Sequence, residues 1–316
     1  MNFALVNSDL SYYSNGKLLL TGEYLVIYGA KALALPVRYG QTINISENKS
    51  NDKLLWIASE NGEEWFRAVF SSKTLSIEEY SDIEIVTFLH KVLTEARLLN
   101  PDFINSNTGT VVETDLNFNR KWGLGSSSTL ITNIALWAHI DPYCLFRKDS
   151  NGSGYDIACA LSQSTIVYQL INNHPVIENI IFNPSFRDNI YFVYLGKKQN
   201  SALSIEYQNN KKQFFINKIE EISQLTDGFI NASSIEQVFP IINEHEKLIS
   251  SILNIPTIQD QLFIGFNGII KSLGAWGGDF VMAITCMDKD TVEKYFISKG
   301  YFVIITFNDM VIKIFA

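Results

Sequence analysis

The pattern of apolar and polar positions changes character past the middle of the chain. In the first part, β-branched or alternating runs are interspersed with segments whose apolar residues repeat at helical spacing. Alternating stretches on both sides of Asn61-Gly62 predict a hairpin with a tight turn. Ser81 and Glu84 form a capping box ahead of a helical repeat. The expected strands are 17–21, 33–46 (broken at Pro36), 53–58, 64–70 and 108–116, and the expected helices are 81–99, about 126–139 and about 155–170.

The later part of the chain predicts helices packed on an antiparallel sheet, which makes the fold class α+β. A boundary is expected near 183–188, around Asn183-Pro184, and it divides an N-terminal domain (1–185) from a C-terminal domain (186–316). The expected strands lie near 178–183, 189–195, 279–286, 301–306 and 310–315, and the expected helices near 202–226, 232–252, 257–273 and 289–298.

Composition narrows the class of protein. The 316 residues are 47% hydrophobic and 18% charged, which is typical of a globular chain with a real core. A formal net charge of −8 argues against nucleic acid as a partner. With no signal-like start, no run of membrane-spanning length and three scattered cysteines, we expect a cytoplasmic protein without membrane attachment. It is expected to be a monomer or a homodimer, since the apolar face of the 232–252 helix packs either internally or on a partner.

Residues 121–129, Lys-Trp-Gly-Leu-Gly-Ser-Ser-Ser-Thr, carry the first candidate chemistry. Gly123 and Gly125 allow a close approach of backbone to an anion, and an apolar helical run follows the serines directly. The free N–H groups and the dipole at a helix start favour phosphate there. The same residues are also compatible with a plain turn and a serine N-cap, so from this segment alone both interpretations stay open.

Three further segments combine glycines with a charged residue. Gly152 to Ala158 places Asp156 in a first helical turn, as a base for a hydroxyl or as an inert helix-start aspartate. Lys17 opens an apolar strand, where it either extends to water or pairs with a carboxylate or phosphate. Gly274 to Asp279 has three glycines in five positions, which serve a helix C-cap or the approach of a ligand. The chain has no Walker-type phosphate motif, and its four histidines lack metal-ligand spacing.

Taken together and in order, these segments resemble the motifs of the GHMP kinase superfamily, named for galactokinase, homoserine kinase, mevalonate kinase and phosphomevalonate kinase. The first motif is matched by 16–26, the second by Gly123 to Ser127 and the third by Gly274 to Gly278. Gly152 to Ala158 is similar to the corresponding stretch of phosphomevalonate kinases, and its spelling Gly-Tyr-Asp-Ile-Ala to a branch called GYDIA-type GHMP kinases. The resemblance spans about residues 12–286.

The resemblance implies a two-domain fold, with an N-terminal domain like ribosomal protein S5 domain 2 and a ferredoxin-like C-terminal domain. It implies an ATP-dependent kinase of a mevalonate- or phosphomevalonate-like small molecule, with ATP and Mg²⁺ as cofactors. Asp156 is then the residue that accepts or orients the acceptor's hydroxyl proton, and Lys17 lowers the pKa of the nucleophile and steadies the phosphoryl group. The implied ATP-phosphate residues are Gly123, Leu124, Gly125, Ser126, Ser127 and Ser128, with Ser127 as Mg²⁺ ligand, and the implied acceptor residues are Glu23, Tyr24, Gly277 and Gly278.

The chain also departs from the family pattern. Arg120-Lys121-Trp122 replaces a proline-containing lead-in of small residues, Asn15 replaces proline, and Trp276 stands where the third motif has glycine. The segment 141–151 contains no glutamate to hold Mg²⁺ as in mevalonate kinases, which leaves Asp149 or water as alternatives. These departures motivate a second hypothesis, a catalytically silent nucleotide- or metabolite-binding protein on the same scaffold.

Overall fold

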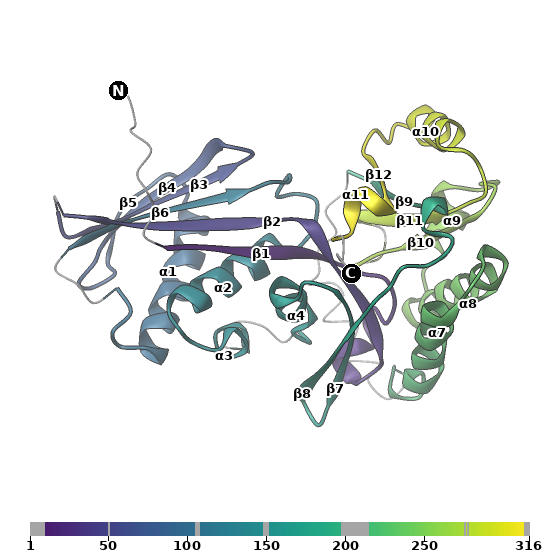
Figure 1. Cartoon of the computed structure of the whole chain (residues 1–316), viewed down its shortest axis with the longest axis horizontal. Helices are drawn as coiled ribbons and strands as arrows, with labels where there is room; N and C mark the ends of the chain where they lie inside the picture. Colours follow the sequence, from purple (N-terminus) through teal and green to yellow (C-terminus); the bar gives the residue numbers. More distant parts are fainter. Residues whose placement is uncertain are drawn as a thin grey trace. The chain divides into compact units, whose positions relative to one another are not determined.

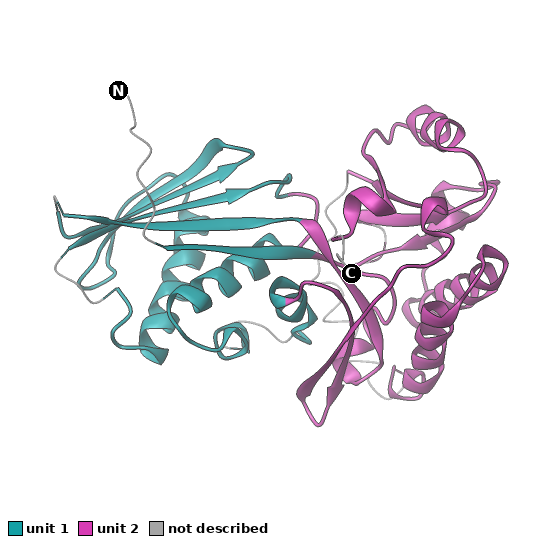
Figure 2. Cartoon of the chain, in the orientation of Figure 1, with its two compact units in different colours: residues 1–16, 39–120, 125–161 teal, residues 17–38, 121–124, 162–316 magenta. Residues whose placement is uncertain are grey.

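The computed structural model describes residues 10–49, 51–104, 108–147, 152–196, 215–274, 276 and 278–312. Figure 1 gives the course of the chain, and Figure 2 colours its two compact units. Unit 1 combines residues 1–16, 39–120 and 125–161, and unit 2 combines 17–38, 121–124 and 162–316. Each unit is therefore assembled from stretches that are far apart in sequence.

Unit 1 is a sheet with helices packed against it. Its strand order is β5-β4-β3-β6-β2, and β1 pairs with β2 outside this path. The β3–β6 pair is parallel, whereas β2–β6, β3–β4 and β4–β5 are antiparallel. The elements are β1 (Leu10–Leu19), β2 (Ala32–Asn48), β3 (Lys53–Glu60), β4 (Glu63–Ser71), β5 (Ile77–Tyr80), α1 (Ile83–Leu99), β6 (Gly109–Leu116), α2 (Ser126–Trp137), α3 (Pro142–Arg147) and α4 (Tyr155–Leu161), of which β1 and β2 continue into unit 2.

One hydrophobic cluster holds unit 1 together. Trp56 and Phe70 project from the sheet against the apolar faces of α1 and α2, which supply Val86 and Ile134 among others. These side chains are almost fully buried, and each contributes roughly 1.5–3 kcal/mol by leaving water. The core thereby fixes the start of α2, the helix that follows the glycine-serine segment.

Unit 2 contains a four-stranded antiparallel sheet in the order β10-β11-β9-β12 and a hairpin, β7–β8, whose first strand pairs with the start of β2. Helix α8 packs on α7 and on β10. Among the described residues, no helix combines the length and apolar character that crossing a membrane requires. The elements are η1 (Val26–Tyr28), β7 (Thr165–Ile171), β8 (His174–Ile180), η2 (Arg187–Asn189), β9 (Ile190–Tyr194), α7 (Ile219–Asn231), α8 (Ile235–Leu253), α9 (Ile258–Leu262), β10 (Ile269–Ser272), β11 (Phe280–Ile284), α10 (Lys289–Ser298), β12 (Ile304–Thr306) and α11 (Phe307–Met310).

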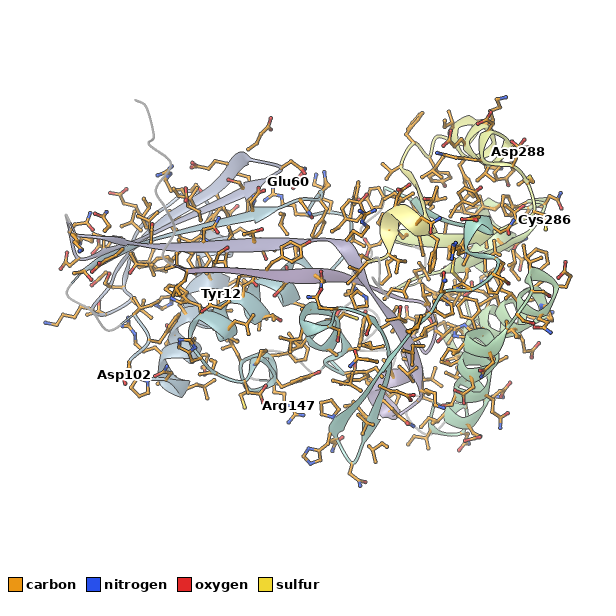
Figure 3. All side chains as sticks on the ribbon, viewed as in Figure 1. Tyr12, Glu60, Asp102, Arg147, Cys286 and Asp288 are labelled. Carbon is orange, nitrogen blue, oxygen red and sulfur yellow. The ribbon has the colours of Figure 1, made fainter. Side chains whose placement is uncertain are left out.

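Most of the expected elements are confirmed, including the hairpin at Asn61-Gly62, the sheet-and-helix rhythm of the later part and the helix at 289–298. Asp288, labelled in Figure 3, caps α10 by accepting from the N–H of Thr291. The apolar face of α8 packs inside unit 2, against residues that include Leu25 and Trp276. The internal alternative for this helix face is therefore the correct one.

Several boundaries were predicted wrongly, each for a local reason. Asp82, not Ser81, caps α1, because its carboxylate accepts from the N–H groups of Glu84 and Ile85. β2 is not broken at Pro36, since this residue falls between the stretches paired with β7 and with β6 and its missing N–H interrupts neither ladder.

Two helical runs were also extended too far. The helix at Tyr155 ends at Leu161, where β-branched residues start β7. The run 257–273 divides into α9 and β10 around Gly265 and Gly268, both at positive φ. At the end of the chain, α11 (Phe307–Met310) includes the first residue of the strand expected at 310–315. Residues 313–315 of that strand and residues 202–214 of the expected helix 202–226 lie outside the described residues. The domain boundary after residue 185 stays a prediction; the two compact units divide the chain differently and assign β7–β8 to unit 2.

Candidate active site

The glycine-serine segment forms a loop that opens directly into α2. Gly123 and Gly125 adopt φ of 68° and 91°, a left-handed conformation that only glycine takes without strain. Gly125 is the N-cap of α2, and it provides no side-chain acceptor for the first N–H groups. All three serines lie inside the first turn, so the serine N-cap interpretation is wrong for this helix. A helix start capped by glycine and lined by hydroxyls is a site that suits an anion.

The residues ahead of this loop are anchored within unit 2. The N–H of Lys17, on β1, donates to the carbonyl of the fully buried Leu124 at 2.9 Å. The hydroxyl of Tyr194 donates to the carbonyl of Lys121 at 3.0 Å, and the ring of Trp122 meets that of Phe280 edge-on at 5.8 Å. The unusual lead-in thus acts as a packing anchor, and two predicted site residues, Lys17 and Leu124, are adjacent.

At the start of the lead-in, Arg120 belongs to unit 1, where its N–H donates to the carboxylate of Glu60 at 3.1 Å. Glu60 is labelled in Figure 3 at the end of β3. The guanidinium of Arg120 lies over the ring of Trp65, 4.1 Å from the centroid, as a cation–π pair. Two of these contacts, the Trp122 ring on Phe280 and the Arg120 guanidinium over Trp65, depend on the large side chains of this lead-in.

Asp279 follows the third glycine segment and lies directly against Gly123. A Cβ placed on Gly123 would fall 2.0 Å from Oδ2 of Asp279, so the glycine leaves the space that this carboxylate fills. Asp279 itself has φ of 43°, a left-handed conformation that aspartate tolerates better than most residues. Burial, and secondarily the charge of Asp279, raise the pKa of Tyr194. A negative charge therefore stands beside the candidate phosphate loop.

Asp156 lies in unit 1, in the first turn of α4, as predicted. The preceding Gly154 has φ of 87°, and the N–H of Tyr155 donates to the hydroxyl of Ser153. Helix α4 packs against α2, so unit 1 holds Asp156 and the serines 126–128 on two neighbouring helices. The carboxylate at a helix start is favoured by the dipole and remains partly exposed.

Unit 2 also contains a buried charge cluster built around Lys271. The ammonium of Lys271, on β10, donates to the carboxylate of Glu23 and to the carbonyl of Ser272 at 2.9 Å, and it lies 3.5 Å from Glu246. Glu246 also accepts from the N–H of Ser272 at 3.2 Å. Lys271 is 0% exposed and Glu23 1% exposed. No sequence pattern reveals this cluster, because its members are 248 and 25 residues apart.

The cluster has perturbed acidities. Burial raises the pKa of Glu23, which Lys271 opposes, and raises the pKa of Glu246 to about 7. Burial and the Lys271 charge lower the pKa of His245 well below its usual value. His245 is therefore neutral and accepts from the N–H of Gly22 at 3.2 Å through Nε2, which lies 3.4 Å from Glu23. Together these contacts fix the turn at residues 22–23.

The next residue connects this turn to the third glycine segment. Tyr24 has φ of 62°, and its hydroxyl accepts from the N–H of Trp276 at 2.9 Å. The Trp276 side chain is buried in an apolar cluster with residues that include Leu25 and Phe215. Tyr24 therefore contacts the third glycine segment at Trp276, while Gly277 lies outside the described residues. Trp276 is a core residue of unit 2 in this structure.

Solved structures that match the chain include kinases of small molecules. Mevalonate kinase of Methanococcus jannaschii matches 98% of this chain and 99% of its own, with a TM-score of 0.71 and 17% identity. Phosphomevalonate kinase of Streptococcus pneumoniae, in complex with phosphomevalonate and AMPPNP, matches 94% and 99%, with a TM-score of 0.69 and 14% identity. Galactokinase of Lactococcus lactis, complexed with galactose, matches 96% and 94%, with a TM-score of 0.61 and 11% identity. No family model and no curated protein sequence matches the chain. On structure, the chain therefore has the α+β fold that these three solved structures share.

Proposed function

We propose that the protein is an ATP-dependent kinase that transfers the γ-phosphoryl group to a mevalonate- or phosphomevalonate-like small molecule. The observation that carries this proposal is the start of α2, where Gly125 caps the helix without a side chain and three serines line the first turn. Phosphoryl transfer depends mainly on positioning and on neutralising charge, and a helix start supplies both. The fold supports the proposal, since its known examples include kinases of mevalonate and phosphomevalonate.

In this proposal the phosphates of ATP bind along Gly123, Leu124, Gly125 and the serines 126–128. The left-handed glycines let backbone N–H groups face the phosphate oxygens without a side chain between them. Lys17, anchored next to the loop through Leu124, neutralises charge on the transferred group and favours deprotonation of the nucleophile. Asp156 accepts the proton where the nucleophile is a hydroxyl, as in mevalonate, or orients the nucleophile where it is a phosphate oxygen, as in phosphomevalonate.

The oxygen atoms of the side chains proposed for the site, that of Ser127 among them, are chemically suited to Mg²⁺. Mg²⁺ prefers oxygen ligands and is usually held by one or two carboxylates or hydroxyls together with phosphate oxygens. Among the described residues, no group of three or more potential ligands forms a ready-made metal site. The cation would therefore arrive with the nucleotide, with the Ser127 hydroxyl as a ligand, and would neutralise phosphate charge during transfer.

The acceptor is proposed to bind near Tyr24, Gly277 and Gly278. The hydrogen bond from the Trp276 N–H to Tyr24 supports a shared surface of the first and third motifs. The carboxylate of Glu23 is enclosed by Lys271 and His245 and is not exposed to an acceptor. Its role in acceptor binding is therefore to hold the turn that carries Tyr24. Preference for a phosphomevalonate-like acceptor is supported by the Gly152 to Ala158 segment, which is similar to that of phosphomevalonate kinases.

The test is release of ADP from MgATP in the presence of mevalonate, phosphomevalonate, diphosphomevalonate, homoserine or galactose. Turnover with one acceptor, absent in Asp156→Asn, would support the proposal and identify the acceptor. Nucleotide binding without turnover on any acceptor favours the alternative, a catalytically silent binding protein. The altered lead-in at residues 120–122 motivates this alternative. A rise in melting temperature with MgATP, measured in parallel, separates it from a protein that binds no nucleotide.

A further inference from the structure

The carboxylate of Asp279 lies directly against Gly123 of the candidate phosphate loop. It fills the space above Gly123 so closely that a methyl group there would overlap Oδ2 at 2.0 Å. Two contacts hold this arrangement. The carbonyl of Asp279 accepts from the N–H of Leu195 at 2.7 Å, and Gly123 follows Trp122, whose ring packs on Phe280. The carboxylate is therefore fixed beside the loop by the β11 strand start.

A fixed carboxylate at this place has an electrostatic consequence. Phosphate groups bound along the loop would lie within a few ångströms of the Asp279 charge, where like charges repel strongly because the partly buried surroundings screen them poorly. A divalent cation reverses this effect, since Mg²⁺ binds a carboxylate and phosphate oxygens at the same time. The carboxylate and the phosphate are then ligands of the same cation and no longer repel each other.

We propose that Asp279 is a Mg²⁺-binding residue of the nucleotide site and makes phosphate binding at the Gly123 loop conditional on the cation. The inference rests on the proposed function, because it assigns a ligand to the same nucleotide site. It concerns the affinity for nucleotide with and without metal, so it is measured without any acceptor or turnover.

The experiment compares ATP binding by isothermal titration calorimetry in EDTA and in excess MgCl₂, for the wild-type protein and for Asp279→Asn. The amide keeps the size of the side chain and removes its charge. We expect the wild type to bind metal-free ATP weakly and MgATP tightly. In Asp279→Asn, metal-free ATP should bind about tenfold more tightly, and the gain in affinity from Mg²⁺ should shrink by a similar factor.

Asp290→Asn is the matched control, since Asp290 is exposed in the first turn of α10 and carries the same charge. It should leave both affinities and the Mg²⁺ gain unchanged. If Asp279→Asn has the same Mg²⁺ gain as the wild type, the inference is overturned while the nucleotide site stands. If the folded wild type binds no ATP in either buffer, the proposed function fails, and the inference with it.

Discussion

Replacing Lys271 by methionine should lower the unfolding free energy more than almost any other single substitution in unit 2. The ammonium is 0% exposed and holds Glu23, Glu246 and the carbonyl of Ser272. Methionine has nearly the same length, so the change removes the charge with little loss of volume. Two buried carboxylates then lose their common cation, and breaking a buried ion pair on one side costs about 3–5 kcal/mol. At about 2–4 °C per kcal/mol, the melting temperature should fall by roughly 10 °C.

The assay is urea denaturation followed by circular dichroism, with calorimetry as a second measure. Lys289→Met is the matched control, because Lys289 is exposed and 3.6 Å from Glu293, and it should change the free energy of unfolding by about 0.5 kcal/mol or less. Adding Glu23→Gln and Glu246→Gln to Lys271→Met should recover at least half of the loss, since no buried charge is then left alone. A loss below about 1 kcal/mol in Lys271→Met would refute the reasoning, as would a triple variant less stable than the single one.

The remaining predictions concern acidity, backbone and catalysis. Because the pKa of Glu246 is raised from 4.5 to about 7, its contribution to stability is complete below pH 4.5 and is lost as the pH rises to about 7. In urea titrations at several pH values, the unfolding free energy of Glu246→Gln should therefore decrease less over this pH range than that of the wild type, by up to about 3 kcal/mol. An unchanged pH dependence would mean that another group causes the decrease. Gly123→Ala should weaken ATP binding at least tenfold in thermal-shift titrations. The control is Gly62→Ala, which is also at positive φ but has nothing within 4 Å of the added methyl group, and it should cost only about 1 kcal/mol of stability. Equal ATP affinities in the two variants would contradict the close approach of Asp279 to Gly123. Asp156→Asn should lower kcat by at least about 100-fold and leave the Kd for ATP within about threefold, and a matching loss of ATP affinity would argue against its proposed role.

The sequence was sufficient for features that depend on neighbours in the chain. The hairpin at Asn61-Gly62, the amphipathic α1 and the glycine loop ahead of α2 all follow from residues within a few positions of one another. Local turn chemistry decided between close alternatives, as in the capping of α1 by Asp82. Runs that are apolar but contain β-branched residues or glycines were harder to divide, which is why α4 and α9 were predicted too long.

Features that depend on distant residues could not be predicted. Lys271 looks like a misplaced charge in a buried strand until Glu23 and Glu246 are placed around it. Asp279 gives no hint in sequence that it fills the space above Gly123, 156 positions earlier in the numbering of the same chain. In sequence, Trp276 is only a departure from the glycine of the third motif, and its burial with Leu25 and Phe215 is a packing role that the fold determines.

The most direct test of the central claim follows the γ-phosphoryl group of ATP by ³¹P NMR, with MgATP, the purified protein and each candidate acceptor. The account predicts that the γ-phosphate signal disappears as ADP forms and that a new phosphoester or diphosphate signal of the acceptor grows at the same rate. It predicts no such signal with Asp156→Asn. If the only new signal is inorganic phosphate, or if the ATP spectrum stays unchanged with every acceptor, the protein is not a kinase of these molecules.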